Sequence, residues 1–245
     1  MIDLWQLNKK FGNLHAVKDV TLRVLPGEIF GFLGPNGAGK TTTIRMMVGL
    51  MKPTSGRVLL GGKDITREPE EAKSILGFIP DRPYLYEKLT GQEFLEFIAD
   101  LHGLDSGDPR GKRIGELLEL FDLTGWSREL VESYSHGMRQ RLLIAAAMIH
   151  RPKVLIVDEP LVGLDPKGAR LVKRLFHDMA KASVAIFMST HILEIAEEMC
   201  HRIGIINDGR VIALGTLQEL RVKSQSSGGR LEDLFLKLTE EDGIG

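Results

Sequence analysis

The chain has 245 residues, and its 32 Lys and Arg side chains almost balance its 33 Asp and Glu side chains, giving a formal net charge of −1. Hydrophobic residues make up 43% and charged residues 27%, which indicates a soluble globular protein whose core needs no disulfides. The near-zero charge disfavours a nucleic-acid partner, because proteins that bind the phosphate backbone carry a basic excess.

Cysteine content and hydropathy exclude further classes. The single cysteine, Cys200, rules out an internal disulfide and a cluster of cysteine ligands. The first residues lack the pattern of a signal peptide, and no apolar run approaches the roughly 18 residues that span a bilayer. We therefore expect a cytoplasmic chain that does not itself form a channel.

The first third of the chain alternates strands with turns and one helix. In residues 20–24 apolar side chains alternate with polar ones, which predicts a half-buried antiparallel strand. Residues 29–33 are continuously apolar, as expected of a strand that is buried on both faces. A helix is expected over residues 40–50, and further short strands over 58–60 and 75–79.

From residue 84 to about 135 the pattern becomes helical. Thr90, followed three residues later by Glu93, forms a capping-box signature. Apolar residues at helical spacing then predict two helices, separated by a loop over residues 103–111. Because strand-type segments resume afterwards, we expect a helical subdomain inserted in an α/β core.

The last third returns to alternating strands and helices. Ser135 is expected to cap a helix that reaches His150, and residues 154–157 form a buried strand. The pattern then predicts helices over 166–180 and 192–200, a strand over 184–188, a hairpin over 203–214 and a short helix from 216. We expect one domain over residues 1–220, followed over residues 221–245 by a flexible link and an amphipathic helix.

The strongest local signal follows the apolar strand at residues 29–33. It fits the pattern G-x-x-x-x-G-K-[ST], placed between a strand and a helix, and predicts a phosphate-binding loop. Backbone N–H groups and a helix N-terminus would surround the phosphates, Lys40 would contact the β- and γ-phosphates, and the Thr41 hydroxyl would ligate Mg²⁺. The expected nucleotide-binding residues are Gly34, Pro35, Asn36, Gly37, Ala38, Gly39, Lys40, Thr41 and Thr42.

Two carboxylates follow the buried strand at residues 154–157. Asp158 is positioned to hold Mg²⁺, and Glu159 to polarise an attacking water. Together with the phosphate loop they predict binding and hydrolysis of a nucleoside triphosphate. Ser135 and Gly137, at the start of another helix, predict a second anion site that would serve a nucleotide held by a partner subunit.

The ordered set of motifs resembles the ATP-binding subunit of an ABC transporter. The motifs are Walker A (Gly34–Thr42), the signature (Tyr134–Gln140), Walker B (Leu155–Glu159), the D-loop (Gly163–Asp165) and the switch motif Ser189-Thr190-His191. The resemblance implies a P-loop α/β core with an antiparallel β-subdomain and an inserted helical subdomain. It also implies ATP and Mg²⁺ as cofactors, and two cassettes packed head to tail around two ATP molecules.

The same resemblance suggests roles for individual residues. Phe11 corresponds to the aromatic residue that stacks on adenine, and Val17 would lie near the base or ribose. Glu159 corresponds to the general base, and His191 to the residue that contacts the γ-phosphate. Asp165 corresponds to the D-loop residue that communicates across the dimer.

Two motifs depart from the family pattern. The usual Leu-Ser-Gly-Gly-Gln signature is replaced by a form that keeps Ser135 and Gly137 and resembles a subgroup of bacterial exporters. Asp81 occupies the place of the Q-loop glutamine, where its carboxylate can still meet Mg²⁺ but, when ionised, cannot donate a hydrogen bond.

The resemblance implies a transmembrane permease as partner and a peripheral position on the inner face of the cell membrane. The second cassette is either another copy of this chain or a paralogue. One alternative is a soluble ABC-type ATPase that acts on ribosomes, DNA or protein assembly; another is a regulatory subunit that does not hydrolyse ATP. Glu159 and His191 argue against the regulatory subunit, and the signature variant favours export over import.

Overall fold

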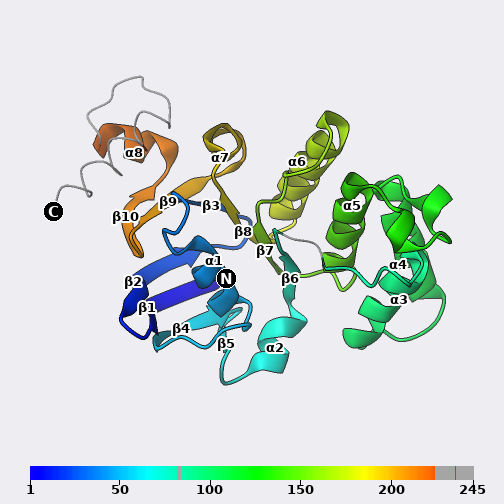
Figure 1. Cartoon of the computed structure of the whole chain (residues 1–245), viewed down its shortest axis with the longest axis horizontal. Coiled ribbons are helices and arrows are strands. Elements are labelled where there is room, and N and C mark those ends of the chain that lie inside the picture. Colours follow the sequence, from blue (N-terminus) through cyan, green and yellow to red (C-terminus); the bar gives the residue numbers. More distant parts are fainter. Residues whose placement is uncertain (82–83, 224–234, 236–245) are drawn as a thin grey trace.

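The computed structural model describes residues 1–81, 84–223 and 235. It contains a four-stranded sheet of order β2-β1-β4-β5 and a six-stranded sheet of order β10-β9-β3-β8-β7-β6 (Figure 1). The expected α/β fold with an antiparallel β-subdomain is confirmed. In the part of the chain described, no helix is both long and apolar enough to cross a membrane.

The smaller sheet is antiparallel throughout. It consists of β1 (Ile2–Phe11), β2 (Leu14–Val24), β4 (Ser55–Leu60) and β5 (Lys63–Asp64). Val20, Leu22 and Val24 are buried and alternate with exposed residues, as the sequence pattern predicts.

The larger sheet is parallel at its centre and forms the middle of the molecule. Its parallel strands are β3 (Ile29–Leu33), β6 (Leu76–Ile79), β7 (Val154–Asp158), β8 (Ala185–Thr190) and β9 (Arg202–Asn207), and β10 (Arg210–Gly215) pairs antiparallel with β9. All residues of β3, β7 and β8 are buried, because both faces of the sheet are covered.

The two faces of this sheet belong to different apolar clusters. Leu155, Ile186 and Met188 pack with residues of α5 (His136–Ala147) and α6 (Pro166–Lys181). Ile156 and Phe187, which point the other way, pack with α1 (Lys40–Met47) and the antiparallel sheet. Because successive side chains of a strand point to opposite faces of the sheet, each continuously apolar strand contributes residues to both clusters. Helix α7 (Leu193–Met199) packs through Ala196 in a third cluster.

The helical subdomain lies at one side of the core (Figure 1). It contains α3 (Gly91–Leu101), α4 (Asp108–Leu120) and the short 3₁₀ helices η1 (Thr124–Trp126) and η2 (Val131–Ser133). The capping box is confirmed, because the Thr90 hydroxyl accepts from the Glu93 N–H at 3.2 Å and the Thr90 N–H donates to the Glu93 carboxylate at 2.8 Å.

Several boundaries differ from the sequence expectations. Helix α1 ends at Met47, not at residue 50, because Gly49 adopts a φ of 73° that leaves the helical region. Helix α4 begins inside the expected 103–111 loop, with Pro109 in its first turn. The short helix α2 (Pro69–Ser74) was not expected.

The end of the chain is described only in part. Helix α8 (Leu217–Lys223) crosses the domain boundary expected at residue 220. Beyond Lys223, the flexible link and the amphipathic helix expected over residues 221–245 otherwise lie outside the described residues. The exception is Phe235, which packs against the cluster containing Leu33 and Leu220.

Candidate nucleotide-binding site

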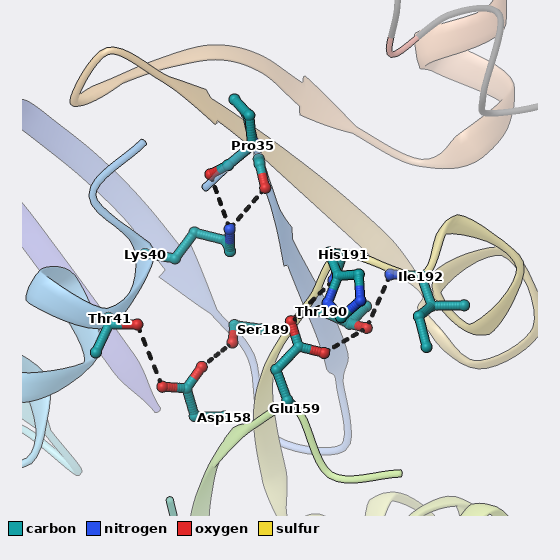
Figure 2. Close-up of polar contacts among 10 residues, drawn as sticks. Pro35, Lys40, Thr41, Asp158, Glu159, Ser189, Thr190, His191 and Ile192 are labelled. Carbon is teal, nitrogen blue, oxygen red and sulfur yellow. Dashed lines mark hydrogen bonds and ion pairs between the residues drawn. The ribbon is translucent and has the colours of Figure 1, made fainter. Parts of the chain in front are cut away.

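A cavity of about 430 Å³ lies where the carboxyl ends of β3, β7 and β8 meet; we call it the nucleotide cavity. Ligands of open parallel sheets bind at this edge. The cavity brings together residues from distant parts of the chain (Figure 2). Its lining comprises Phe11, Leu14, Ala16, Asn36, Gly37, Gly39, Lys40, Thr41, Thr42, Asp81, Asp158, Glu159 and His191.

The loop between β3 and α1 forms one wall. Gly39 has a φ of 107°, and a Cβ there would lie 2.6 Å from the Ala16 carbonyl oxygen, so only glycine fits. Gly34, Pro35 and Ala38 do not line the cavity. They shape the loop through their backbones, as when the Ala38 N–H donates to the Pro35 carbonyl at 3.2 Å.

The Lys40 side chain lies along this loop. Its Nζ donates to the carbonyl oxygens of Gly34 at 2.6 Å and Pro35 at 3.0 Å (Figure 2). Burial lowers the pKa of the Lys40 ammonium, and the negative charges of Glu159 and Asp158 oppose that shift. A nearly buried cation therefore lies beside backbone N–H groups, which suits an anionic ligand.

Asp158 ends β7 at the bottom of the cavity. Its carboxylate accepts a hydrogen bond from the Ser189 hydroxyl and a longer one, at 3.4 Å, from the Thr41 hydroxyl. Burial raises the pKa of the Asp158 carboxyl, the Ser189 hydrogen bond lowers it, and the nearby carboxylates of Asp81 and Glu159 raise it further.

The oxygen atoms of Thr41 and Asp158 fit a magnesium ion. Within the described residues there is no group of three His, Cys, Asp or Glu side chains that could enclose a metal. Mg²⁺ does not need such a cage, since it is commonly held by one or two protein oxygens together with substrate phosphates and water. Asp81 lines the same cavity and adds a further carboxylate.

Glu159 and His191 form a connected pair at the cavity edge. Glu159 Oε1 accepts from the His191 N–H at 3.0 Å and lies 2.7 Å from His191 Nδ1. Its Oε2 accepts from the Thr190 hydroxyl at 3.1 Å (Figure 2). Glu159 also has a positive φ of 53°, an unfavourable conformation for a non-glycine residue. These contacts fix the carboxylate in one orientation, as a general base requires.

Phe11, Leu14 and Ala16 form the apolar end of the cavity. Phe11 ends β1 and is 45% exposed, with Lys9 Nζ 5.1 Å from its ring centroid. An exposed aromatic ring beside a phosphate loop can stack on a base. Val17, which the resemblance places near the base or ribose, is completely buried and does not itself line the cavity, but it lies behind the loop, where a Cβ on Gly39 would be 3.5 Å from its Cγ2.

Three further expected site residues, Ser135, Gly137 and Asp165, belong to elements away from this cavity. Ser135 caps α5, accepting from the Met138 N–H at 3.3 Å, and Asp165 caps α6, accepting from the Gly168 N–H at 2.8 Å. Gly137 lies near the D-loop, where a Cβ on it would be 3.6 Å from the Gly163 carbonyl oxygen. The signature and the D-loop are therefore neighbours on another part of the surface.

Four residues of the site were given no role in the sequence analysis. Ser189 and Thr190 hold the two carboxylates, and Leu14 and Ala16 line the apolar end. The available signal was weak: two hydroxyl residues end a strand, next to the histidine that was predicted. Their role depends on β8 pairing with β7, with Ser189 opposite Asp158.

Comparison with known proteins identifies similar sequences. The family model described as "ABC transporter" matches residues 17–162. The linearmycin resistance ATP-binding protein LnrL of Bacillus subtilis is 38% identical over 90% of this chain and 70% of its own length. The ABC-type transporter ATP-binding protein EcsA of the same organism is 39% identical over 93% and 92%, respectively.

Solved structures give the same result. An ATP-binding subunit of an ABC transporter superposes with a TM-score of 0.93 at 34% identity, covering 98% of this chain and 99% of the other. A dimeric ATP-binding cassette in a post-hydrolysis state, bound to ADP and Pi, superposes with a TM-score of 0.81 at 27% identity, covering 89% and 99%.

Proposed function

Because the chain belongs to the ABC transporter family of ATP-binding proteins, we propose that ATP binds in the nucleotide cavity and that its hydrolysis drives a separate permease. The protein is an ATP-binding and ATP-hydrolysing subunit of an ABC transporter. The observation that carries the proposal is the meeting of the phosphate loop, Asp158 and the Glu159–His191 pair around one cavity.

For binding, we propose that the loop N–H groups and Lys40 hold the phosphates while Phe11 stacks on the base. Lys40 then exchanges its contacts with the Gly34 and Pro35 carbonyls for phosphate oxygens. Asn36, Gly37, Gly39, Thr41 and Thr42 line the same wall, which supports their assignment to the nucleotide.

For hydrolysis, we propose that Thr41 and Asp158 hold Mg²⁺, with Asp81 beside them. The ion neutralises charge on the phosphates when bound. Glu159 accepts a proton from the attacking water, and His191 orients the Glu159 carboxylate and reaches the γ-phosphate. The contacts of Glu159 Oε1 with His191 support this division of roles.

We propose that two cassettes close head to tail, as the resemblance implies. Ser135 and Gly137 would then contact the phosphates held by the partner, because they lie at the N-terminus of α5 and away from their own cavity. Asp165 belongs to the D-loop, which lies beside Gly137, and would transmit changes in one cassette to the other across the interface. The dimeric relative bound to ADP and Pi supports the arrangement.

We propose export, at the inner face of the cell membrane, as the direction and place of action. The resistance function named for LnrL supports export. A groove lined by Leu50, Tyr84 and Tyr86 is a suitable contact for an apolar segment of the permease, because these three side chains are exposed and the two tyrosines lie within five residues of Asp81 in the sequence. Movement of the helical subdomain would then couple conformational changes of the permease to those of the nucleotide cavity.

The direct test is isolation of the tagged chain from native membranes in a mild detergent. A multi-spanning permease should co-purify in stoichiometric amount, and ATP hydrolysis by the complex should depend on it. Recovery of ribosomes, DNA or a soluble assembly in its place would reject the permease assignment.

Asp81 gives a prediction about the altered Q-loop position. Replacing it with glutamine keeps a side-chain oxygen and removes a negative charge beside Asp158, so ATP turnover should stay within about threefold of wild type. Steady-state phosphate release at several Mg²⁺ concentrations measures this. Asp81→Ala, which removes the oxygen as well, is the matched control. Its phosphate release should require a higher Mg²⁺ concentration than that of Asp81→Gln. Complete loss of turnover in Asp81→Gln would show that the carboxylate itself is required.

A further inference from the structure

A second cavity, of about 450 Å³, lies at the opposite edge of the large sheet; we call it the distal cavity. Lys153 and Val184, which line it, directly precede β7 and β8, whereas Asp158 ends β7 at the nucleotide cavity. At about 3.3 Å per residue, the two cavities are separated by roughly 16 Å of strand. The distal cavity is therefore not an extension of the nucleotide site.

Most of the distal cavity is apolar. Its walls include three methionines, two prolines and a valine: Met1, Met148, Met179, Pro26, Pro152 and Val184. Methionine side chains adapt their shape to an irregular or flexible apolar ligand. The volume falls within the range of small-molecule sites.

Every charged side chain that lines the distal cavity is basic: Arg113, Arg151 and Lys153. Arg151 and Lys153 are exposed, and neither side chain forms an ion pair or hydrogen bond with any described residue. Arg113 donates to the Met148 carbonyl at 2.9 Å and lies 3.7 Å from Glu116, but its Nε is buried without a partner. Burial and the nearby charge of Arg151 lower the pKa of the Arg113 guanidinium. The cavity thus concentrates positive charge, and within the described part of the chain Arg151 and Lys153 have no acidic partner.

Arg151 is also held in an unusual backbone conformation. Its φ is 53°, just after the end of α5 and before Pro152, where its N–H donates to the Met148 carbonyl at 3.1 Å. Glycine would adopt this left-handed conformation with less strain. An arginine at such a position points to a role for its side chain.

We propose that the distal cavity binds a small amphipathic anion of the fatty-acid class, with its carboxylate between Arg151 and Lys153 and its alkyl chain against the methionines. A purely polar anion would leave the apolar wall in contact with water, and a neutral apolar molecule would leave the cations unpaired. Because Arg113 belongs to α4 and Lys153 adjoins β7, the ligand would bridge the helical subdomain and the core.

Calorimetry with the full chain tests this, using decanoate, decanol and acetate as probes. Decanoate should bind saturably and at least about tenfold more tightly than decanol, which lacks the charge, or acetate, which lacks the chain. Absence of saturable binding, or equal binding of decanol, would overturn the proposal.

Two variants test the location. Arg151→Gly with Lys153→Gln should weaken decanoate binding at least about tenfold, whereas Lys112→Ala, which removes a neighbouring exposed charge outside the cavity, should leave it unchanged. Glycine suits the φ of residue 151, so the melting temperature should not fall. Lys40→Ala should still bind decanoate, and this result is independent of the role proposed for the nucleotide cavity. Undiminished binding by the double variant, or displacement of decanoate by ATP, would place the ligand elsewhere.

Discussion

Lys40→Ala is expected to abolish measurable ATP binding. Among the described residues that line the nucleotide cavity, Lys40 is the one lysine or arginine, and its Nζ is already desolvated, so its contacts with phosphate would be strong. Loss of two charge-assisted contacts to phosphate weakens binding by more than about 100-fold. Isothermal calorimetry with Mg-ATP measures the effect.

The fold of this variant needs a separate check. Lys40 donates to two loop carbonyls, which alanine leaves without that partner, so circular dichroism and the melting temperature should accompany the titration. Lys112→Ala is the matched control, because it removes a lysine far from the cavity and should bind ATP normally. Unchanged ATP affinity in a folded Lys40→Ala protein would refute the assignment of the phosphate loop.

The phosphate loop and both carboxylates could be predicted because their signals are local. The glycines at residues 34, 37 and 39 stand between a strand and a helix, and each local pattern is complete within nine residues. Asp158 and Glu159 likewise follow a strand whose apolar run is continuous. No tertiary information was needed to place these groups at the carboxyl edge of a parallel sheet.

Val17 shows why the apolar end of the cavity was harder to predict from the sequence. Val20, Leu22 and Val24 are buried at even positions, a parity that would turn Val17 outward. Asp19 has a φ of 54°, and the β1–β2 register shifts around Lys9, so the side chains change faces between residues 17 and 20. Val17 is buried as a result, and Ala16 lines the cavity. A bulge of this kind leaves no clear mark in the hydrophobic pattern.

The contacts of Ser189 and Thr190 with the carboxylates were not predicted, for a different reason. Their hydroxyls act on carboxylates 31 residues earlier in the chain, and the contact exists because β8 pairs with β7 in the order β3-β8-β7. The distal cavity has the same origin, since its basic residues come from α4 and from the turn before β7. Strand order and helix placement decide both features, and local sequence patterns do not specify them.

Glu159→Gln should retain ATP binding and reduce turnover by at least about 100-fold, because it removes the carboxylate proposed as the general base. Glutamine has the same shape and keeps one oxygen to accept from the His191 N–H, so the cavity should keep its geometry. The binding site for the phosphates is untouched, and the closed dimer should therefore accumulate. Size-exclusion chromatography with Mg-ATP and a phosphate-release assay measure the two effects.

The double variant Lys40→Ala with Glu159→Gln distinguishes dimer closure that depends on bound ATP from association that does not. It lacks the base but also cannot hold ATP, so it should elute as a monomer in the same buffer in which Glu159→Gln alone elutes as a dimer. If Glu159→Gln itself stays monomeric with Mg-ATP, and no paralogous cassette pairs with it, the head-to-tail sandwich is wrong. Ser135 and Gly137 would then have no partner phosphate to contact, and their positions at the N-terminus of α5 would reflect helix capping alone.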